Sequence, residues 1–308
     1  MLDAIYTIVT PWAVANRKQI LKNRVLGRIV NYIYPIYCKL NLIQTSSSVA
    51  GGQYNEKIVV SLTSYPARIS KVYLCINTLL RQNVKPERII LWLAESQFPN
   101  RDTVPKNLLE LQKKGLEIRF CEDLRSYKKV FFTAQEYMDR IIVTADDDTL
   151  YPESWIKGLM QEHKKYPECV VCYRAHMIRY LENGFAPYKE WTGLSPGIKG
   201  PEINLIPVGV GGVLYPKYYF KDVCFDKEII KKICPTVDDL WLKILGFKKN
   251  IEVVKVNENS KEWFTIRSSQ KTSLMSTNVG ENCNDVELAL LIGHYKINPM
   301  DYQPNKTV

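Results

Sequence analysis

The feature that most constrains the fold is an alternation of strand-like runs with segments of helical periodicity. Five strand-like runs occur in the first 175 residues, at 58–63, 89–94, 116–121, 141–145 and 170–173. Between the first two, residues 72–82 place apolar side chains at helical spacing, and the same spacing recurs after Pro152 at Trp155, Ile156, Leu159 and Met160. Strands buried on both faces and joined by helices form parallel, doubly wound sheets. The sequence therefore predicts an α/β fold with a mostly parallel sheet and flanking helices.

Composition divides the chain into a leader, residues 1–50, and one large domain, residues 54–308. A Ser/Gly-rich stretch at 45–53 is typical of a linker. With 308 residues, 46% of them hydrophobic, the chain can bury a sizeable core. Ligands of doubly wound sheets bind at the carboxyl ends of the strands. We therefore expect residues 57–173 to form a nucleotide-binding half, and the less regular residues 174–308 to complete the pocket for a second substrate.

The leader is basic and rich in aromatic residues. It holds half of the chain's net charge of +10, because its only acidic residue is Asp3 and its basic residues are Arg17, Lys18, Lys22, Arg24, Arg28 and Lys39. A helix over 17–33 would place four apolar residues on one face: Leu26, Ile29, Val30 and Ile33. Two interpretations stay open: an interfacial helix that binds an anionic membrane surface, or a helix packed on its own domain with a solvated basic face.

The sequence near the start predicts neither a membrane span nor a cleaved signal peptide. Residues 4–15 form an uncharged stretch of twelve residues that contains Pro11, whereas a span needs about twenty. The basic residues follow this stretch, whereas a signal peptide carries them before it. The eight cysteines are scattered, which favours reduced thiols in the core. We expect a cytoplasmic protein, at most peripheral on the inner face of the cell membrane.

The strongest chemical signal is the run Asp146, Asp147 and Asp148, directly after the strand predicted at 141–145. Adjacent carboxylates repel one another unless a cation neutralises them, and hard oxygen ligands suit Mg²⁺ or Mn²⁺. A cation there can bridge a diphosphate and stabilise it as it leaves. A solvated acidic turn is the structural alternative. A haloacid-type phosphatase loop is disfavoured, because Leu150 occupies the position where its Thr would fall.

This strand, the acidic run and the following Pro152 resemble the DXD region of GT-A nucleotide-sugar glycosyltransferases of the bacterial family-two-like kind. Residues 60–66 resemble the opening strand end of the same family. The resemblance covers roughly residues 57–245. It implies a GT-A (Rossmann-like) fold and a glycosyltransferase that depends on Mn²⁺ or Mg²⁺ and uses a nucleotide-sugar donor such as a UDP-sugar. Because the basic, aromatic leader suits a membrane-borne acceptor, we expect a glycan or lipid-linked acceptor in capsule, lipopolysaccharide or other cell-surface polysaccharide synthesis.

The resemblance also implies roles for individual residues. The positions expected to bind the donor are Thr63, Ser64, Tyr65, Arg68, Glu95, Asp123, Lys128, Lys129 and Asp146. The metal is expected at Asp146, Asp147 and Asp148. The usual motif is Asp-x-Asp, so three aspartates in a row leave the register open: spacing favours Asp146 with Asp148, whereas counting back from Pro152 favours Asp147.

A second acidic pair, Asp238 and Asp239, stands at the start of a helix predicted near 237–246. Inverting members of the family carry such a pair, and one of its carboxylates takes the proton from the attacking hydroxyl, a role that we assign to Asp239. Capping of the helix is the structural alternative. The preceding loop contains Gly211 and Gly212, which would let the backbone approach the acceptor closely.

Several alternatives stay open. His294 could be a further metal ligand, although its setting favours a packed helix, and Asn282, Asn284 and Asp285 could line the donor site or form a turn. A retaining glycosyltransferase would use the second acidic pair to orient substrate. A sugar nucleotidyltransferase is disfavoured, because the sequence has no Gly-rich phosphate loop near the first strand. A basic nucleic-acid-binding protein is the rival from another class, but no recognition motif is evident, and we expect no nucleic-acid partner.

Overall fold

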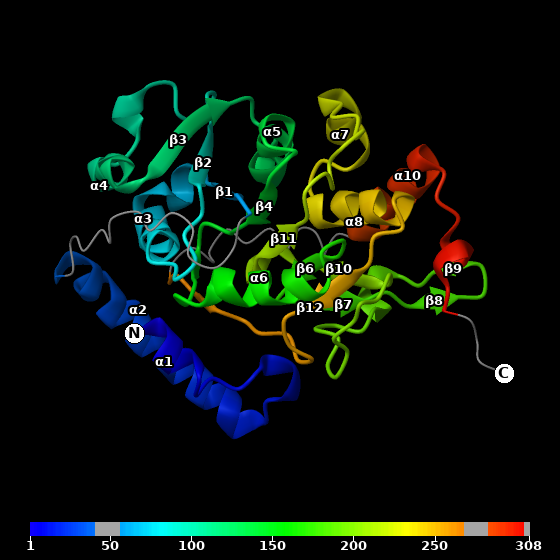
Figure 1. Ribbon diagram of the computed structural model, residues 1–308, viewed down its shortest axis with the longest axis horizontal. Coiled ribbons are helices and arrows are strands. Elements are labelled where there is room, and N and C mark those ends of the chain that lie inside the picture. The colour runs from blue at the N-terminus through cyan, green and yellow to red at the C-terminus, as the bar shows by residue number, and fades with distance from the viewer. Residues whose placement is uncertain (41–55, 268–282, 305–308) are drawn as a thin grey trace.

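The computed structural model describes residues 1–40, 56–267 and 283–304 (Figure 1). The predicted linker at 45–53 and Asn282 lie outside the described residues. A seven-stranded sheet occupies the centre, in the order β12-β6-β11-β4-β1-β2-β3. Its strands are β1 (Ile58–Thr63), β2 (Arg88–Ala94), β3 (Leu116–Cys121), β4 (Ile141–Thr144), β6 (Val170–Cys172), β11 (Val213–Tyr215) and β12 (Val253–Lys255).

The sheet is mostly parallel, as predicted. Strands β1, β2, β3 and β4 pair in parallel with one another, and β12 is parallel to β6. Only β11 runs against its neighbours β4 and β6. Three two-stranded pairs accompany the sheet: β5 (Thr149–Leu150) with β13 (Phe264–Thr265), β7 (Ala175–Met177) with β10 (Leu205–Pro207), and β8 (Tyr180–Leu181) with β9 (Gly184–Phe185).

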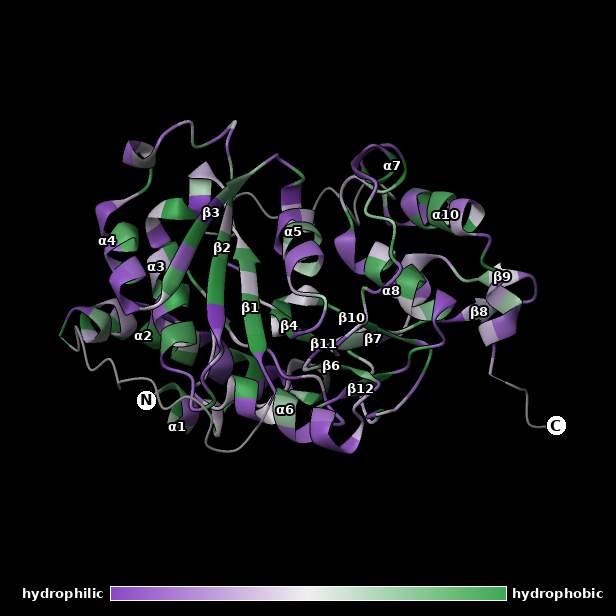
Figure 2. Ribbon diagram, turned by 45° about the horizontal axis from the view of Figure 1, so that its top comes forward, coloured by the Kyte–Doolittle hydropathy of each residue, from purple (hydrophilic) through white to green (hydrophobic). Residues whose placement is uncertain are grey.

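Helices cover both faces of the sheet (Figure 1). One apolar core joins the sheet to α1 (Leu2–Tyr6), α2 (Arg17–Leu40), α3 (Pro66–Leu80), α4 (Lys106–Leu109) and α6 (Trp155–Lys165). A second core on the other face joins it to α5 (Lys128–Glu136), α7 (Lys227–Ile233), α8 (Asp238–Lys248) and α10 (Cys283–Tyr295). Figure 2 shows the strongly hydrophobic residues gathered on the central strands, whereas the edge strand β3 carries polar residues along its length.

The structure shifts one predicted helix start. The four apolar residues expected on one face of α6, from Trp155 to Met160, are all fully buried. The helix itself begins at Trp155 rather than at Pro152, because Thr149 and Leu150 first pair with β13 and the chain turns before the helix. Strand β11, inside the loop region expected over 193–217, was not predicted.

The leader packs on the domain, which agrees with one of the two interpretations of its helix, but the apolar face expected over 26–33 is divided between the inside and the outside. Asn23, Val30, Tyr34 and Cys38 of α2 point inward, while Ile29 and Ile33 are exposed. Polar and small residues turn inward because they find close partners there. Asn23 hydrogen-bonds the backbone of Thr10 in both directions, and a Cβ on Gly27 would lie 3.0 Å from the Phe264 ring.

None of the described helices is both long and apolar enough to cross a membrane. All eight cysteines lie within the described residues, and each is a free thiol. Six of them are buried; Cys224 is exposed and Cys283 is partly exposed. The sequence interpretation of reduced thiols, most of them in the core, agrees with this arrangement.

Candidate active site

Two neighbouring parallel strands, β1 and β4, bring the first group of polar side chains together. Their register pairs Ser61 with Thr144, so both strands end at the same edge of the sheet. The chain leaves β1 through Ser64 and Tyr65, and Pro66 starts α3 at the helix position where proline is favoured. It leaves β4 into residues 146–148. This edge is where ligands of doubly wound sheets bind.

Arg68 and Ser64 neutralise and hold two of the three aspartates. The Ser64 hydroxyl donates to Asp147 Oδ2 at 2.5 Å, and Arg68 Nη1 lies 2.9 Å from Asp147 Oδ1 and 3.0 Å from Asp148 Oδ2. Burial raises the pKa of Asp147, and Arg68 and Ser64 oppose that increase. The counter-charge that three adjacent carboxylates require is thus supplied in part by an arginine of α3. The Arg68 guanidinium also lies over the Tyr65 ring, 5.4 Å from its centroid.

Lys129 connects the two acidic segments that the sequence singled out. Its ammonium lies 3.0 Å from Asp146 Oδ1 and 3.4 Å from Asp238 Oδ2, although these aspartates belong to different halves of the chain. Burial of Lys129 opposes its charge, but Asp146, Asp238 and Asp239 together raise its pKa. A permanent cation therefore stands between the carboxyl end of β4 and the start of α8.

Asp239 lies beside this lysine in a setting that favours its neutral form. Its Oδ2 accepts the Gly209 N–H at 3.2 Å. Burial, followed by the charge of Asp238, raises the pKa of Asp239 to about 7. A carboxyl whose pKa lies near the working pH can take up and release a proton in a reaction. Asp239 is therefore a buried carboxyl that can exchange a proton near neutral pH.

Glu287 caps the helix that carries the acidic pair. Its carboxylate accepts the Val237 N–H at 3.1 Å and both the N–H and the hydroxyl of Thr236, at 3.2 and 2.5 Å. The structure records no side-chain cap at Val237, the N-cap residue of α8. A residue of α10 thus satisfies backbone donors at the helix start. The alternative that the two aspartates serve mainly as caps is not supported, because they face Lys129 and Gly209 instead.

The glycines of the 208–216 loop have two different surroundings. A Cβ on Gly209 would lie 3.3 Å from Lys129 Nζ, 3.5 Å from Asp239 Oδ1 and 3.6 Å from Asp146 Oδ1, so this backbone position adjoins all three side chains. Gly211 and Gly212, the predicted acceptor contacts, instead approach protein. A Cβ on Gly212 would lie 2.3 Å from the Trp155 ring, and the Trp155 indole donates to the Gly211 carbonyl at 2.9 Å.

Of the remaining predicted donor residues, Asp123 and Lys128 form a pair after the end of β3. Lys128 Nζ donates to Asp123 Oδ1 at 2.7 Å, and Gln97, which the sequence did not single out, donates to Asp123 Oδ2 at 2.9 Å. Glu95 is exposed at the end of β2. The Thr63 hydroxyl donates to the Trp92 carbonyl at 2.9 Å, which makes it a link between β1 and β2.

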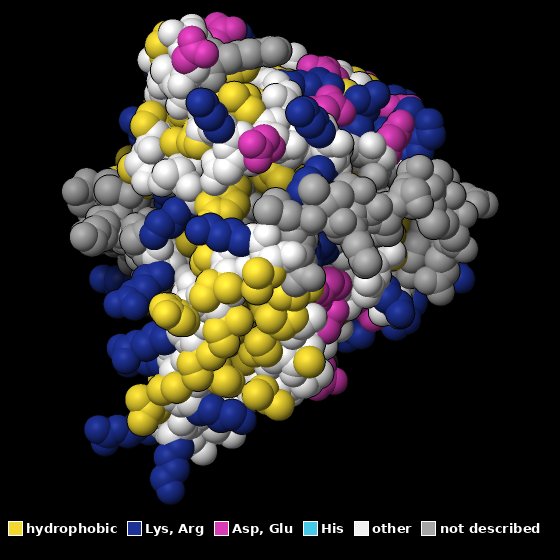
Figure 3. Space-filling model, turned by 90° about the vertical axis from the view of Figure 1, so that its left-hand side faces the viewer, with side chains coloured by type: hydrophobic (Ala, Val, Ile, Leu, Met, Phe, Trp, Pro, Cys, Tyr) yellow, Lys and Arg dark blue, Asp and Glu magenta, His cyan; other side chains and the backbone are white. Residues whose placement is uncertain are grey.

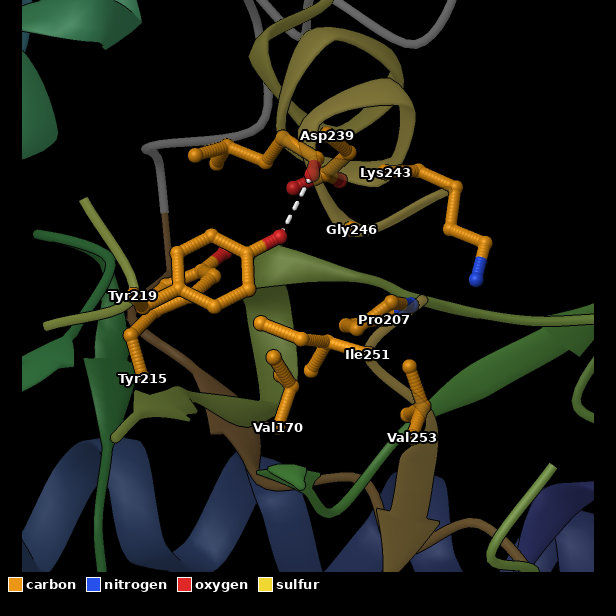
Figure 4. A pocket seen from close by; sticks show the side chains of 10 residues that line it. Val170, Pro207, Tyr215, Tyr219, Asp239, Lys243, Gly246, Ile251 and Val253 are labelled. Carbon is orange, nitrogen blue, oxygen red and sulfur yellow. Dashed lines mark hydrogen bonds between the residues drawn. The ribbon is translucent and has the colours of Figure 1, made fainter. Parts of the chain in front are cut away.

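A small pocket lies behind Asp239, between α8 and the sheet (Figure 4). Its walls are mostly apolar, and the dashed line in Figure 4 is the hydrogen bond from the Tyr219 hydroxyl to the Leu242 carbonyl. Lys243, one helical turn after Asp239, is buried here, and burial lowers its pKa to about 7. Its amine donates to the Ile203 carbonyl. This apolar surrounding explains the desolvation that raises the pKa of Asp239.

Three polar residues of the second half were missed in the sequence. Arg174 follows β6, lies against Gly211 and pairs with Glu262 at 3.3 Å. His176 accepts the Leu194 N–H at 2.9 Å, and burial followed by the charge of Arg174 lowers its pKa to about 4. No local pattern marks these residues, because their partners lie far along the chain.

In the described part of α10, the polar residues Asn284, Asp285 and His294 make no hydrogen bond or ion pair with the group around Lys129. Asp285 accepts the Tyr188 N–H at 2.7 Å, and Asn284 is buried at the start of α10. His294 is exposed in the last turn of α10 and packs edge-on against Tyr295. The interpretation of His294 as part of a helix agrees with this placement. Within the described ranges, no group of three or more His, Cys, Asp or Glu side chains converges as a metal-ligand set.

No protein-family model matches the chain, and no curated protein sequence matches it significantly. The function must therefore be argued from the arrangement of these side chains.

Proposed function

We propose that this chain is a glycosyltransferase that moves a sugar from a nucleotide-sugar donor, a UDP-sugar, to a hydroxyl of a glycan or lipid-linked acceptor in cell-surface polysaccharide synthesis. The observation that carries the proposal is the meeting of two acidic segments, 146–148 and 238–239, across the buried Lys129. One segment ends a central strand of the doubly wound sheet, and the other starts a helix of the opposite half. A site at this junction can hold two substrates side by side.

The donor is proposed to lie over β1 and β4. Lys129 and Arg68 are fixed cations at the strand ends and suit the negative charge of a diphosphate. The aromatic ring of Tyr65 and the polar group around Asp123 flank the same edge and offer contacts for base and ribose. In this proposal the two cations pair with the aspartate carboxylates before the donor binds. When the donor binds, some of these ion pairs are replaced by ion pairs with its phosphates.

The exposure of the aspartates favours one register for a divalent cation. The side chain of Asp146 is the most exposed of the three, at 23%, and that of Asp147 is the least exposed, at 5%. Asp148 is 10% exposed and, like Asp147, pairs with Arg68. Its other oxygen accepts a long hydrogen bond from Thr149, at 3.4 Å, whereas Ser64 holds that of Asp147 at 2.5 Å. Mg²⁺ and Mn²⁺ are commonly held by one or two carboxylates together with substrate phosphates, so a converging set of three protein ligands is not required. We propose that Asp146 and Asp148 hold Mn²⁺ or Mg²⁺ together with the donor. The cation would supply charge stabilisation to the leaving diphosphate.

Asp239 is proposed as the general base of an inverting transfer. It takes the proton of the acceptor hydroxyl while that oxygen bonds to the anomeric carbon of the sugar. The bond from this carbon to the phosphate oxygen breaks, and its electron pair leaves with the nucleoside diphosphate. Lys129 lies close enough to Asp239 to favour its ionised form before it accepts the proton. After the proton transfer, the same cation stabilises the negative charge of the leaving nucleoside diphosphate.

A thermal-shift screen of nucleotide sugars with Mn²⁺ and with EDTA tests this proposal. A ligand that binds only the folded state stabilises it by about 2.7 kcal/mol at 100 times its dissociation constant. We expect one class of nucleotide sugar to raise the melting temperature, and EDTA to reduce the effect. If no nucleotide sugar stabilises the protein under either condition, the proposal is wrong. If binding occurs but the transferred sugar keeps its anomeric configuration, a retaining mechanism replaces the role of Asp239.

A further inference from the structure

The outward face of α2 carries a continuous stripe of exposed apolar side chains. Seven of them are 45–80% exposed: Leu21, Val25, Ile29, Tyr32, Ile33, Ile36 and Leu40. Because an α-helix turns by about 100° per residue, all seven fall within an arc of about 120°. This arc lies opposite the inward-pointing Val30 and Tyr34. The helix is therefore apolar on two sides, and the domain covers only one of them.

Basic residues border this stripe. Arg17, Arg24, Arg28 and Lys39 follow one flank of the helix, and Lys18 and Lys22 stand at its N-terminal end. All six are exposed, and none forms an ion pair with another residue in the described ranges. Figure 3 faces this side of the molecule and shows a yellow apolar band with Lys and Arg along its left edge and at its lower end.

We propose that the outward face of α2 docks on an anionic lipid bilayer, with the helix lying parallel to the membrane surface. An interfacial helix binds by burying its apolar face among the lipids while its basic residues are attracted to anionic headgroups. Contiguous apolar surface of this kind marks an interaction site on a protein. A second copy of the chain is a poorer occupant, because a two-fold contact with antiparallel helices would bring the two basic flanks together, and one with parallel helices would bring the Lys18 and Lys22 ends together. The proposal is independent of the transfer chemistry proposed above.

The docked helix is attached to the segment that carries the candidate metal ligands. The Tyr6 hydroxyl of the leader donates to the Leu150 carbonyl of β5 at 2.6 Å and accepts the Phe264 N–H of β13 at 2.8 Å. Asn31 of α2 donates to the Thr265 carbonyl at 3.0 Å, and the next residue, Ile266, donates to the Asp148 carbonyl at 2.6 Å. Docking would therefore hold the candidate site at a fixed position relative to the membrane.

Co-sedimentation of the full chain with lipid vesicles tests the proposal. We expect binding to phosphatidylcholine vesicles that contain phosphatidylglycerol, and weaker binding at high salt or without the anionic lipid. The double variant Ile29→Gln/Ile36→Gln should weaken binding by at least about tenfold, because each side chain loses its apolar contact with lipid. Arg24→Gln/Arg28→Gln should weaken it at low salt by about fivefold per residue. Val286→Gln, a change at a 59% exposed position of α10, is the matched control and should bind like the parent protein.

Point substitutions are used because deletion of the leader would remove Leu2, Tyr6, Val30 and Tyr34 from the core. Tyr32→Gln, at a 76% exposed position, provides an independent variant should the double variant melt early. The proposal is wrong if the parent protein does not sediment with anionic vesicles, or if the apolar variants sediment as the parent does. It is also wrong if vesicle binding is absent and sedimentation velocity shows a dimer that these variants dissociate, because the face would then be a self-association surface.

Discussion

Replacement of Asp239 by asparagine should stabilise the folded protein at pH 8 while it removes the proposed base. The amide has nearly the same size as the carboxylate and can still accept the Gly209 N–H. It cannot ionise, so it removes the cost of keeping a charged carboxylate in a desolvated site next to Asp238. Residues that serve a reaction at the expense of stability are expected to behave in this way.

The magnitude follows from the pKa of Asp239. Burial and the neighbouring Asp238 raise this pKa from the ordinary value of 3.8 to about 7. Between these two values the folded state binds a proton that the unfolded state lacks, so the free energy of unfolding falls as pH rises. One pKa unit is equivalent to about 1.4 kcal/mol. The ionised Asp239 therefore lowers the free energy of unfolding by at most about 4 kcal/mol above pH 7, and it has no effect below about pH 4. Because Lys129 loses one neighbouring carboxylate in the variant, we expect a net gain of roughly 1–4 kcal/mol at pH 8.

Melting temperature as a function of pH is the measurement. In a chain of this size the melting temperature rises by about 2–4 °C for each kcal/mol added to the free energy of unfolding. Asp239→Asn should therefore melt several degrees above the parent protein at pH 8. The difference should shrink as the pH falls towards 4. Glu228→Gln, at an 82% exposed side chain of α7, is the matched control and should show no such difference. If Asp239→Asn melts at or below the parent temperature at pH 8, the ionised carboxylate costs the folded state nothing, and the reasoning from a desolvated Asp239 with a raised pKa is refuted.

Three further predictions concern residues around the same site. Lys129→Met should destabilise the fold by about 3–5 kcal/mol in urea unfolding at pH 8, since Asp146 and Asp238 would lose their shared cation, and should recover part of that loss at low pH. Asp148→Asn should leave the fold intact but remove the Mn²⁺ dependence of donor binding in calorimetry; donor binding that stays equally sensitive to EDTA would contradict the metal assignment. Glu287→Ala should cost about 0.5–2 kcal/mol by removing the cap of α8, and Glu287→Gln should cost less; equal losses would show that packing rather than capping matters.

The fold could be predicted where the signal is local. The runs at 58–63 and 116–121 coincide with β1 and β3, because apolar residues and the turns that bound them are visible in a short window. Strand β11 was not predicted, since its three residues stand between Gly212 and Pro216 in a stretch whose glycines and prolines indicate a loop. Which face of α2 turns inward was left open by the sequence. Hydrophobicity alone does not reveal that Asn23 has a hydrogen-bonding partner inside or that Gly27 permits close contact with Phe264.

In the candidate site, too, local sequence signals could be predicted and long-range contacts could not. The acidic runs at 146–148 and 238–239 could be found because consecutive carboxylates are conspicuous in a sequence. The bridging position of Lys129 and the cap from Glu287 could not, because both depend on contacts between distant segments. The sequence assigned the counter-charge at 146–148 to a divalent cation, whereas in the structure Arg68 and Lys129 lie within ion-pair distance of these aspartates. The metal remains a proposal that rests on Asp146 and Asp148.

The most direct test of the central claim measures donor affinity and nucleoside-diphosphate release for the parent protein and for Asp239→Asn with the same nucleotide sugar. We expect the donor dissociation constant to change little, because the donor is placed over β1 and β4. We expect turnover with acceptor to fall by about 100- to 10,000-fold at pH 7.5, since general-base help is lost. If Asp239→Asn turns over at the parental rate, or if the parent protein neither binds nor cleaves any nucleotide sugar, the account is contradicted.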